Sequence, residues 1–280
     1  MEIIIAKTAG FCFGVKRAVE LAFANQNIEG TYTFGPIIHN EVVTGQLEEK
    51  GIYVIDDIEN KAVKNLIIRS HGVSPNIYEE SAKRNIKVID ATCPYVKKIH
   101  DLVKVYHQKG YGIIIAGNKQ HPEVQGINGW ADNRCLIVKD ANELKASMHQ
   151  LTKDHYLLVA QTTYKKEVVD EMVEWLKMMT IHFEYVNTIC NATRQRQEEV
   201  VQIAKKVDVM LILGSKNSSN SQKLFEISQK YCKRSYFISD LSELDSYMVE
   251  LCNKVGITAG ASTPESVIAQ VVKYLEQLET

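Results

Sequence analysis

Short apolar runs alternate with longer amphipathic stretches along the whole chain. Runs such as residues 65–68, 113–116 and 209–213 are typical of strands. In residues 95–108 the apolar side chains recur at helical spacing and form one stripe. Strands that alternate with helices predict an α/β fold with largely parallel sheets. Longer helices are expected at residues 15–24, 95–108, 166–178, 197–206, 222–231 and 264–278.

Three cysteines, Cys12, Cys93 and Cys190, each lie just ahead of such a helical pattern. A thiol there meets unpaired backbone N–H groups and the positive end of the helix dipole, which favours the thiolate. Basic residues within the first turns, among them Lys97 and Arg196, add to this effect. Three thiolates prepared in the same way suggest one shared electrophile, for which a metal centre is the natural candidate.

Aligning the chain on these cysteines exposes a long internal repeat. A strand-like run after each cysteine ends in a glycine, and the intervals are 23, 24 and 24 residues, to Gly35, Gly117 and Gly214. A second polar loop follows another strand in each repeat, at residues 69–72, 161–163 and 259–262. The repeat predicts three pseudo-symmetric α/β units in residues 14–93, 94–186 and 187–280. Because ligands collect at the carboxyl ends of parallel strands, we expect the units to form a trefoil whose loops meet at a central cavity.

Composition narrows the class of protein. The chain has 280 residues and a formal net charge of −1, which gives no electrostatic case for a nucleic-acid partner. No apolar run approaches the roughly 20 residues that span a bilayer, and the N-terminus carries no signal-peptide pattern. We therefore expect a cytoplasmic protein without a membrane partner. Six cysteines in a long, core-forming chain without a signal-peptide pattern argue against a disulfide framework, and the absence of a CxxC pair excludes a zinc ribbon and a thioredoxin motif. Cys135, Cys232 and Cys252 are interpreted as packing residues.

The remaining polar loops offer donors for an anion. Three loop histidines accompany a hydroxyl- and amide-rich segment after the strand at residues 209–213, and together they suggest a phosphate or diphosphate pocket. Taken alone, that segment would more simply cap a helix. The candidate ligands are His39, His71, His121, Ser218, Ser219, Asn220 and Ser262.

Glu123 is the best-placed carboxylate in these loops, with Glu41 and Asp90 as rivals. A carboxyl group that faces a desolvated cavity has a raised pKa and can deliver protons. Thr162 and Thr163 can complete a hydroxyl relay beside it. The plainer interpretation of Glu123, an exposed glutamate in a turn, stays open at this point.

Seven long and specific motifs are spread over nearly the full chain. They are residues 9–15 (AGFCFGV), 35–40 (GPIIHN), 69–73 (RSHGV), 90–94 (DATCP), 121–124 (HPEV), 214–220 (GSKNSSN) and 257–262 (ITAGAS). Together they resemble the motifs of the 4-hydroxy-3-methylbut-2-enyl diphosphate reductase (LytB/IspH) family of the non-mevalonate isoprenoid pathway.

The resemblance implies a trefoil around a [4Fe–4S] cluster with one iron not ligated by protein, and a first strand, residues 1–13, that joins the third unit. The cluster ligands would be Cys12, Cys93 and Cys190. The seven donors above would hold the substrate diphosphate, its allylic hydroxyl would bind the open iron, and Glu123 and Thr162 would lie in the proton path. The implied activity is reductive dehydroxylation to isopentenyl and dimethylallyl diphosphate with two electrons and two protons. A ferredoxin or flavodoxin is a fair hypothesis for the electron donor, and a monomer is expected.

Three other functions would use the same thiols. A non-redox dehydratase would use an open iron only as a Lewis acid and would need no reductant. A cluster carrier or iron–sulfur sensor would need the cysteines but no diphosphate pocket. A zinc site with three cysteine ligands would leave the protein colourless.

Overall fold

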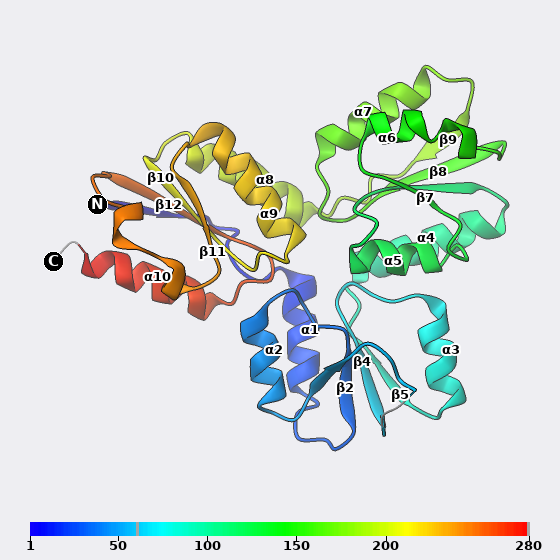
Figure 1. The fold of residues 1–280 in the computed structure, drawn as a ribbon, viewed down its shortest axis with the longest axis horizontal. Helices are drawn as coiled ribbons and strands as arrows, with labels where there is room; N and C mark the ends of the chain where they lie inside the picture. The colour runs from blue at the N-terminus through cyan, green and yellow to red at the C-terminus, as the bar shows by residue number, and fades with distance from the viewer. Residues whose placement is uncertain (60–61, 279–280) are drawn as a thin grey trace. The chain divides into compact units, whose positions relative to one another are not determined.

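The computed structural model describes residues 1–59 and 62–278, and in this part of the chain three four-stranded sheets are found, all parallel (Figure 1). This confirms the predicted α/β class and the three repeated units. Residues 60–61 and 279–280, which fall within the predicted first and third units, lie outside the described residues.

The first sheet has the strand order β3-β2-β4-β5. Its strands are β2 (Thr31–Phe34), β3 (Tyr53–Ile55), β4 (Asn65–Ile68) and β5 (Lys87–Asp90). Three helices belong to the same stretch of sequence: α1 (Phe13–Phe23), α2 (Glu41–Glu48) and α3 (Pro75–Lys83). Pro75 opens α3 at a position where a backbone N–H is not needed.

The second sheet has the order β7-β6-β8-β9 and is covered on both faces (Figure 1). Its strands are β6 (Gly112–Ala116), β7 (Leu136–Val138), β8 (His155–Ala160) and β9 (His182–Tyr185). Its helices are α4 (Pro94–Gln108), α5 (Pro122–Gly129), α6 (Ala141–Ala146) and α7 (Lys166–Lys177), with a 3-10 turn η1 (Met148–Gln150). Ile113 packs with α4 and α5, whereas its neighbour Ile114 packs with α6 and α7. Because successive side chains point to opposite faces, burial of both faces requires the unbroken apolar run.

The third sheet has the order β1-β12-β10-β11 and includes the first strand of the chain. Its strands are β1 (Glu2–Ile5), β10 (Val209–Leu213), β11 (Ser235–Ile238) and β12 (Lys254–Ala259). Its helices are α8 (Asn191–Ala204), α9 (Ser219–Tyr231) and α10 (Glu265–Gln277), with 3-10 turns η2 (Leu241–Glu243) and η3 (Ser246–Met248). In Figure 1, α8 and α9 lie on one face of this sheet and α10 on the other, in agreement with two separate buried clusters.

The three sheets share one topology. β2, β6 and β10 each lie between two neighbours, and the next strands in the chain, β3, β7 and β11, form one edge. The following strands, β4, β8 and β12, lie on the other side and pair with the opposite edge strands, β5, β9 and β1. The repeat seen in the sequence is therefore a repeat of strand order.

The helices depart from the sequence expectation mainly at their starts. α8 begins at Asn191 rather than residue 197, because polar residues such as Thr193 and Arg196 are buried in its first turns and hide the apolar stripe. α9 begins at Ser219 because Ser218 caps it. The shorter helices α2, α3, α5 and α6 were not anticipated, since they offer too few turns for a helical period to stand out.

By compactness the chain divides into two units. One contains residues 1–16, 38–46 and 191–280, and the other contains residues 17–37 and 47–190. The division into residues 14–93, 94–186 and 187–280 with strand 1–13 stays a prediction.

Candidate functional site

The three cysteines singled out from the sequence occupy equivalent places. Cys12 follows β1 and precedes α1, Cys93 follows β5 and precedes α4, and Cys190 follows β9 and precedes α8. In each case the cysteine N–H donates to a carbonyl in the loop after the neighbouring strand of the same sheet. The acceptors are the carbonyl oxygens of Ala261 for Cys12 (3.3 Å), Ser70 for Cys93 (2.9 Å) and Thr162 for Cys190 (3.0 Å). The repeat thus extends to the backbone hydrogen bond that fixes each cysteine.

Two side chains of α8 hold the loop that leads to Cys12. Arg196, which is 5% exposed, donates from Nη2 to the Gly10 carbonyl (2.7 Å) and from Nη1 to a carbonyl in the first turn of α8 (3.1 Å). Glu199 accepts from the backbone N–H groups of residues 7 and 8 (2.8 and 2.9 Å). The helix that starts after Cys190 therefore also fixes the approach to Cys12. The sequence placed Arg196 near a thiol but gave no sign of this contact, which joins residues far apart in the chain.

Two of the candidate histidines meet in one unit. The rings of His71 and His121 lie 5.3 Å apart between centroids and nearly perpendicular. His121 caps α5, and its Nδ1 accepts from the Glu123 N–H (3.2 Å). A neutral imidazole whose Nδ1 accepts carries its proton on Nε2, so His121 can donate from Nε2 to an anion.

Glu123 is buried and bound to Thr162. The carboxylate oxygens accept from the Thr162 N–H and from its hydroxyl, both at 2.6 Å. Burial raises the pKa of Glu123 to about 7, although both hydrogen bonds favour the charged form. The exposed-turn interpretation is wrong, because the side chain is only 2% exposed. Glu123 can therefore hold or release a proton near neutral pH.

The rival carboxylates have different surroundings. Burial alone would raise the pKa of Asp90, but hydrogen bonds from Lys97 Nζ (2.8 Å) and the Thr92 N–H (3.0 Å) outweigh it and hold the pKa below its usual value. Glu41 lies at the exposed start of α2 and accepts from Ser215 and Asn217. Of these three carboxyl groups, only Glu123 combines burial with a raised pKa, as a proton donor requires.

The segment after β10 forms a tight polar loop. Ser218 accepts from the Ser221 N–H (3.3 Å) and so caps α9, as the plainer interpretation expected. The Ser262 hydroxyl lies 3.4 Å from that of Ser218. Asn220 does not cap: it is 4% exposed, and neither polar atom of its side chain has a hydrogen-bond partner in the described structure. A buried amide without hydrogen-bond partners can form hydrogen bonds with a bound ligand.

Two glycines allow the loop to close. A Cβ added at Gly214 would come within 2.3 Å of the Ser221 hydroxyl oxygen, and one at Gly260 within 1.9 Å. Ser221 is fully buried between them. The start of α9 can thus approach the ends of β10 and β12, which carries Ser218 toward Ser262.

The two compact units divide the predicted site residues. The first contains Cys12, His39, Ser218, Ser219, Asn220 and Ser262, and the second contains Cys93, Cys190, His71, His121, Glu123 and Thr162.

The other three cysteines pack as expected. Cys232 is buried among the residues of α8, α9 and β10, and Cys135 and Cys252 are half-buried against apolar clusters. Burial raises the pKa of the Cys135 thiol to about 12, so it stays protonated. All six cysteines lie in the described part of the chain, and none of them is in a disulfide.

Comparison with known proteins decides the family. The sequence pattern of the LytB protein family matches residues 3–276. The chain belongs to the LytB family. A LytB relative from Caldanaerobacter subterraneus subsp. tengcongensis is 45% identical, and the match covers 100% of this chain and 98% of the relative. One from Clostridioides difficile is 44% identical over 99% of this chain and 100% of its own. Both are named 4-hydroxy-3-methylbut-2-enyl diphosphate reductase.

Solved structures of LytB-type proteins agree with this placement. The diphosphate reductase from Plasmodium falciparum superposes with a TM-score of 0.91 at 32% identity, covering 98% of this chain and 87% of that one. A reductase described as the terminal enzyme of the non-mevalonate pathway gives a TM-score of 0.73 at 40% identity, covering 99% and 100%. Within residues 1–59 and 62–278, no helix is long and apolar enough to cross a membrane.

Proposed function

We propose that this LytB-family chain is an iron–sulfur enzyme that reduces 4-hydroxy-3-methylbut-2-enyl diphosphate to isopentenyl and dimethylallyl diphosphate. Membership of the family over residues 3–276 carries the proposal. The buried Glu123 also supports it: its carboxyl group is bound to Thr162 and has a pKa of about 7, so it can supply a proton for the reaction.

Cys12, Cys93 and Cys190 are the proposed ligands of a [4Fe–4S] cluster that keeps one iron without a protein ligand. The donor set fits, since the three thiols stand at equivalent strand-to-helix junctions and thiolates suit iron–sulfur clusters. When bound, such a cluster supplies electrons and an open iron that acts as a Lewis acid.

The diphosphate would be held by His39, His71, His121, Ser218, Ser219, Asn220 and Ser262. Two observations support this role for members of the set. Asn220 carries a buried amide with no hydrogen-bond partner among the described residues, and His121 accepts through Nδ1, so its neutral ring carries the proton on Nε2. Lys216, the only cation in residues 214–221, pairs instead with Glu243 (2.8 Å), so neutral donors would carry most of the binding.

Glu123 would deliver a proton through Thr162. The reaction breaks the C–O bond of the allylic alcohol, and the oxygen leaves as water after taking one proton. The second proton forms the new C–H bond, and two electrons balance the reduction. Hydroxide is a poor leaving group, so a neutral acid beside it lowers the barrier.

The electron donor is proposed to be a ferredoxin or flavodoxin, whose low potential suits the task. A cytoplasmic location and a monomeric state stay predictions.

The test is an anaerobic assay with the allylic diphosphate and reduced methyl viologen, with products identified by mass spectrometry. We expect both five-carbon diphosphates, only with reductant present. Loss of water without reductant would support the dehydratase, and a colourless protein that contains zinc would support the zinc site. Cys93→Ser should lose both colour and turnover, with Cys135→Ser as the matched control that keeps both.

A further inference from the structure

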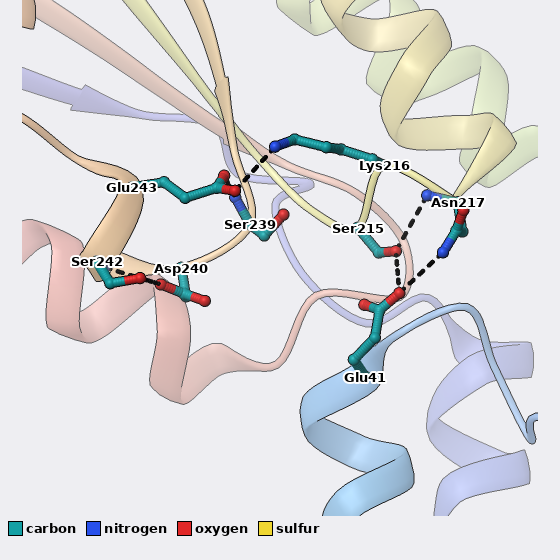
Figure 2. Close-up of polar contacts among 8 residues, drawn as sticks. All are labelled: Glu41, Ser215, Lys216, Asn217, Ser239, Asp240, Ser242 and Glu243. Carbon is teal, nitrogen blue, oxygen red and sulfur yellow. Dashed lines mark hydrogen bonds and ion pairs between the residues drawn. The ribbon is translucent and has the colours of Figure 1, made fainter.

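A carboxylate outside the proposed site bonds to the segment that carries Ser218 and Asn220. Glu41 Oε1 accepts from the Ser215 hydroxyl and from the Asn217 side-chain N–H₂, both at 3.0 Å (Figure 2). Residues 38–46 and 191–280 belong to the same compact unit. The contact therefore joins two chain segments that lie more than 170 residues apart in sequence.

The contact is part of a closed set of hydrogen bonds. The Ser215 hydroxyl oxygen accepts from the Asn217 N–H (3.1 Å), so Glu41, Ser215 and Asn217 form a ring of three bonds. Ser215 is 2% exposed, which keeps water from replacing these bonds at its hydroxyl. The ring fixes the backbone of residues 215–217 relative to the start of α2.

The same loop is held from its other side. Lys216 points away from Glu41 and its Nζ lies 2.8 Å from Glu243 Oε1 (Figure 2). Glu243 also accepts from the Ser239 N–H (2.8 Å), which ties the ion pair to the segment after β11. Two carboxylates thus fix three successive residues of one loop, and neither needs a ligand to do so.

Both segments joined by Glu41 carry proposed diphosphate ligands. His39 lies two residues before Glu41, and the intervening Asn40 is buried and accepts from the Val43 N–H (3.1 Å), which fixes the start of α2. Ser218 follows Asn217 directly. A change in the Glu41 contact would therefore alter the spacing between ligands on the two segments.

We propose that Glu41 is a positioning residue for diphosphate recognition: it holds loop 215–217 against the start of α2 and so presets the donors on both segments. The inference rests on the proposed function. A carboxylate near an anion gives no attraction, so the value of Glu41 lies in its geometry as a double acceptor. Preset donors lose less conformational entropy when the ligand binds, and affinity rises accordingly.

Two variants distinguish the hydrogen-bonding geometry of Glu41 from its charge. Glu41→Gln keeps an oxygen that can accept both hydrogen bonds, and so should bind diphosphate within about threefold of the native chain. Glu41→Ala leaves Ser215 and Asn217 without their acceptor and should weaken binding by about tenfold or more, because hydrogen bonds to a charged acceptor are stronger than those between neutral groups. Because the loss falls on binding, KM should rise while kcat changes less than about threefold.

The experiment combines calorimetric titration of the holoenzyme with inorganic diphosphate and steady-state kinetics on the allylic diphosphate. Glu226→Ala, which removes an exposed glutamate of α9 paired with Lys223, is the matched control and should behave as the native chain does. Ser215→Ala removes one donor to Glu41 and the acceptor of the Asn217 N–H, and the double variant should cost less than the sum of the two single variants, because both remove the Ser215–Glu41 bond. That lack of additivity marks action through the shared contact.

Unchanged diphosphate affinity and KM in Glu41→Ala would overturn the inference. So would a Glu41→Gln variant as weak as Glu41→Ala, because charge rather than geometry would then be responsible. Should the native chain bind diphosphate but fail to reduce the allylic substrate, the proposed function falls while the calorimetric comparison still decides the role of Glu41.

Discussion

The surroundings of individual side chains, more than their identities, separate the three loop carboxylates. Asp90 accepts a hydrogen bond from a lysine, and the exposed Glu41 accepts hydrogen bonds from two neutral side chains. Glu123 is buried and accepts a hydrogen bond from Thr162. The sequence named all three and favoured Glu123 by its place after His121. It could not decide between them, because the partner hydroxyl of Glu123 comes from the loop after β8, 39 residues further along the chain.

Glu123→Gln removes the proton donor and keeps the shape of the side chain. The amide can still accept from the Thr162 N–H and donate to its hydroxyl oxygen, so we expect diphosphate affinity within about threefold of native. Loss of general-acid assistance should lower kcat by about 10²–10⁴-fold. Single-turnover kinetics and calorimetry measure the two effects, with exposed Glu167→Gln as control. Near-normal turnover in Glu123→Gln would remove this residue from the mechanism.

The pKa of Glu123 also predicts the pH dependence of turnover. A carboxyl group with a pKa of about 7 is protonated below that value and ionised above it. The acid form, and with it kcat, should therefore fall about tenfold per pH unit once the pH exceeds about 7. The profile is measured between pH 6 and 9 with reductant in excess, and Glu123→Gln should lack this limb. A native rate that rises across that range would contradict the assignment.

Among the elements, strands were easier to predict than helices. The runs at residues 65–68 and 209–213 became β4 and β10 with the same bounds, since burial on both faces leaves an unbroken apolar signal. The start of α8 was placed late because Arg196 is charged in the sequence yet buried in the fold. Its contact with Gly10 depends on chain segments meeting in space, which no local pattern reports.

The Arg196 contact predicts a role in holding Cys12, the proposed cluster ligand. Arg196→Leu removes the hydrogen bonds to the Gly10 carbonyl and to the first turn of α8, so the loop before Cys12 should loosen. We expect iron content after anaerobic purification to fall by half or more, with a matching loss of visible absorbance. Arg194→Leu is the control, since Arg194 is exposed and pairs with Glu198. Equal iron content in the two variants would rule this role out.

The loop of His71 depends on a close approach to α4. Gly72 has a φ of +71°, and a Cβ there would lie 2.4 Å from Cε1 of His100. His100 is buried and stacks on Trp130, whose Nε1–H donates to the Val73 carbonyl (3.0 Å), so it has little room to move. Burial lowers the pKa of His100 to about 4, which keeps this packing uncharged at neutral pH.

Gly72→Ala should therefore destabilise the protein more than backbone strain alone would. Gly110, with a φ of +87° and nothing within 4 Å of an added Cβ, supplies the matched control. Gly110→Ala should cost about 1–2 kcal/mol of unfolding free energy, the strain of a left-handed residue. Gly72→Ala should cost about 1–3 kcal/mol beyond that, from overpacking. Urea unfolding measures the loss of unfolding free energy in both variants, and equal losses would show that His100 moves aside at little cost.

For the whole molecule, the repeat in the sequence anticipated three α/β units, and the structure adds that their sheets share one strand order. The intervals of 23, 24 and 24 residues between cysteine and glycine revealed the units, because each interval spans one helix and one strand. The two compact units were not foreseen. Residues 38–46 group with residues 191–280 through contacts such as that of Glu41 with Ser215, and side-chain pairs of this kind leave no periodic trace.

In the proposed function, Cys12, Cys93 and Cys190 hold an iron–sulfur cluster that binds and reduces the allylic diphosphate. An anaerobic visible and EPR spectrum of the purified protein, before and after addition of that substrate, tests it most directly. We predict a brown protein whose reduced cluster signal shifts when substrate is added, and no such shift with inorganic diphosphate alone. A protein that stays colourless and EPR-silent after reconstitution with iron and sulfide would contradict the account.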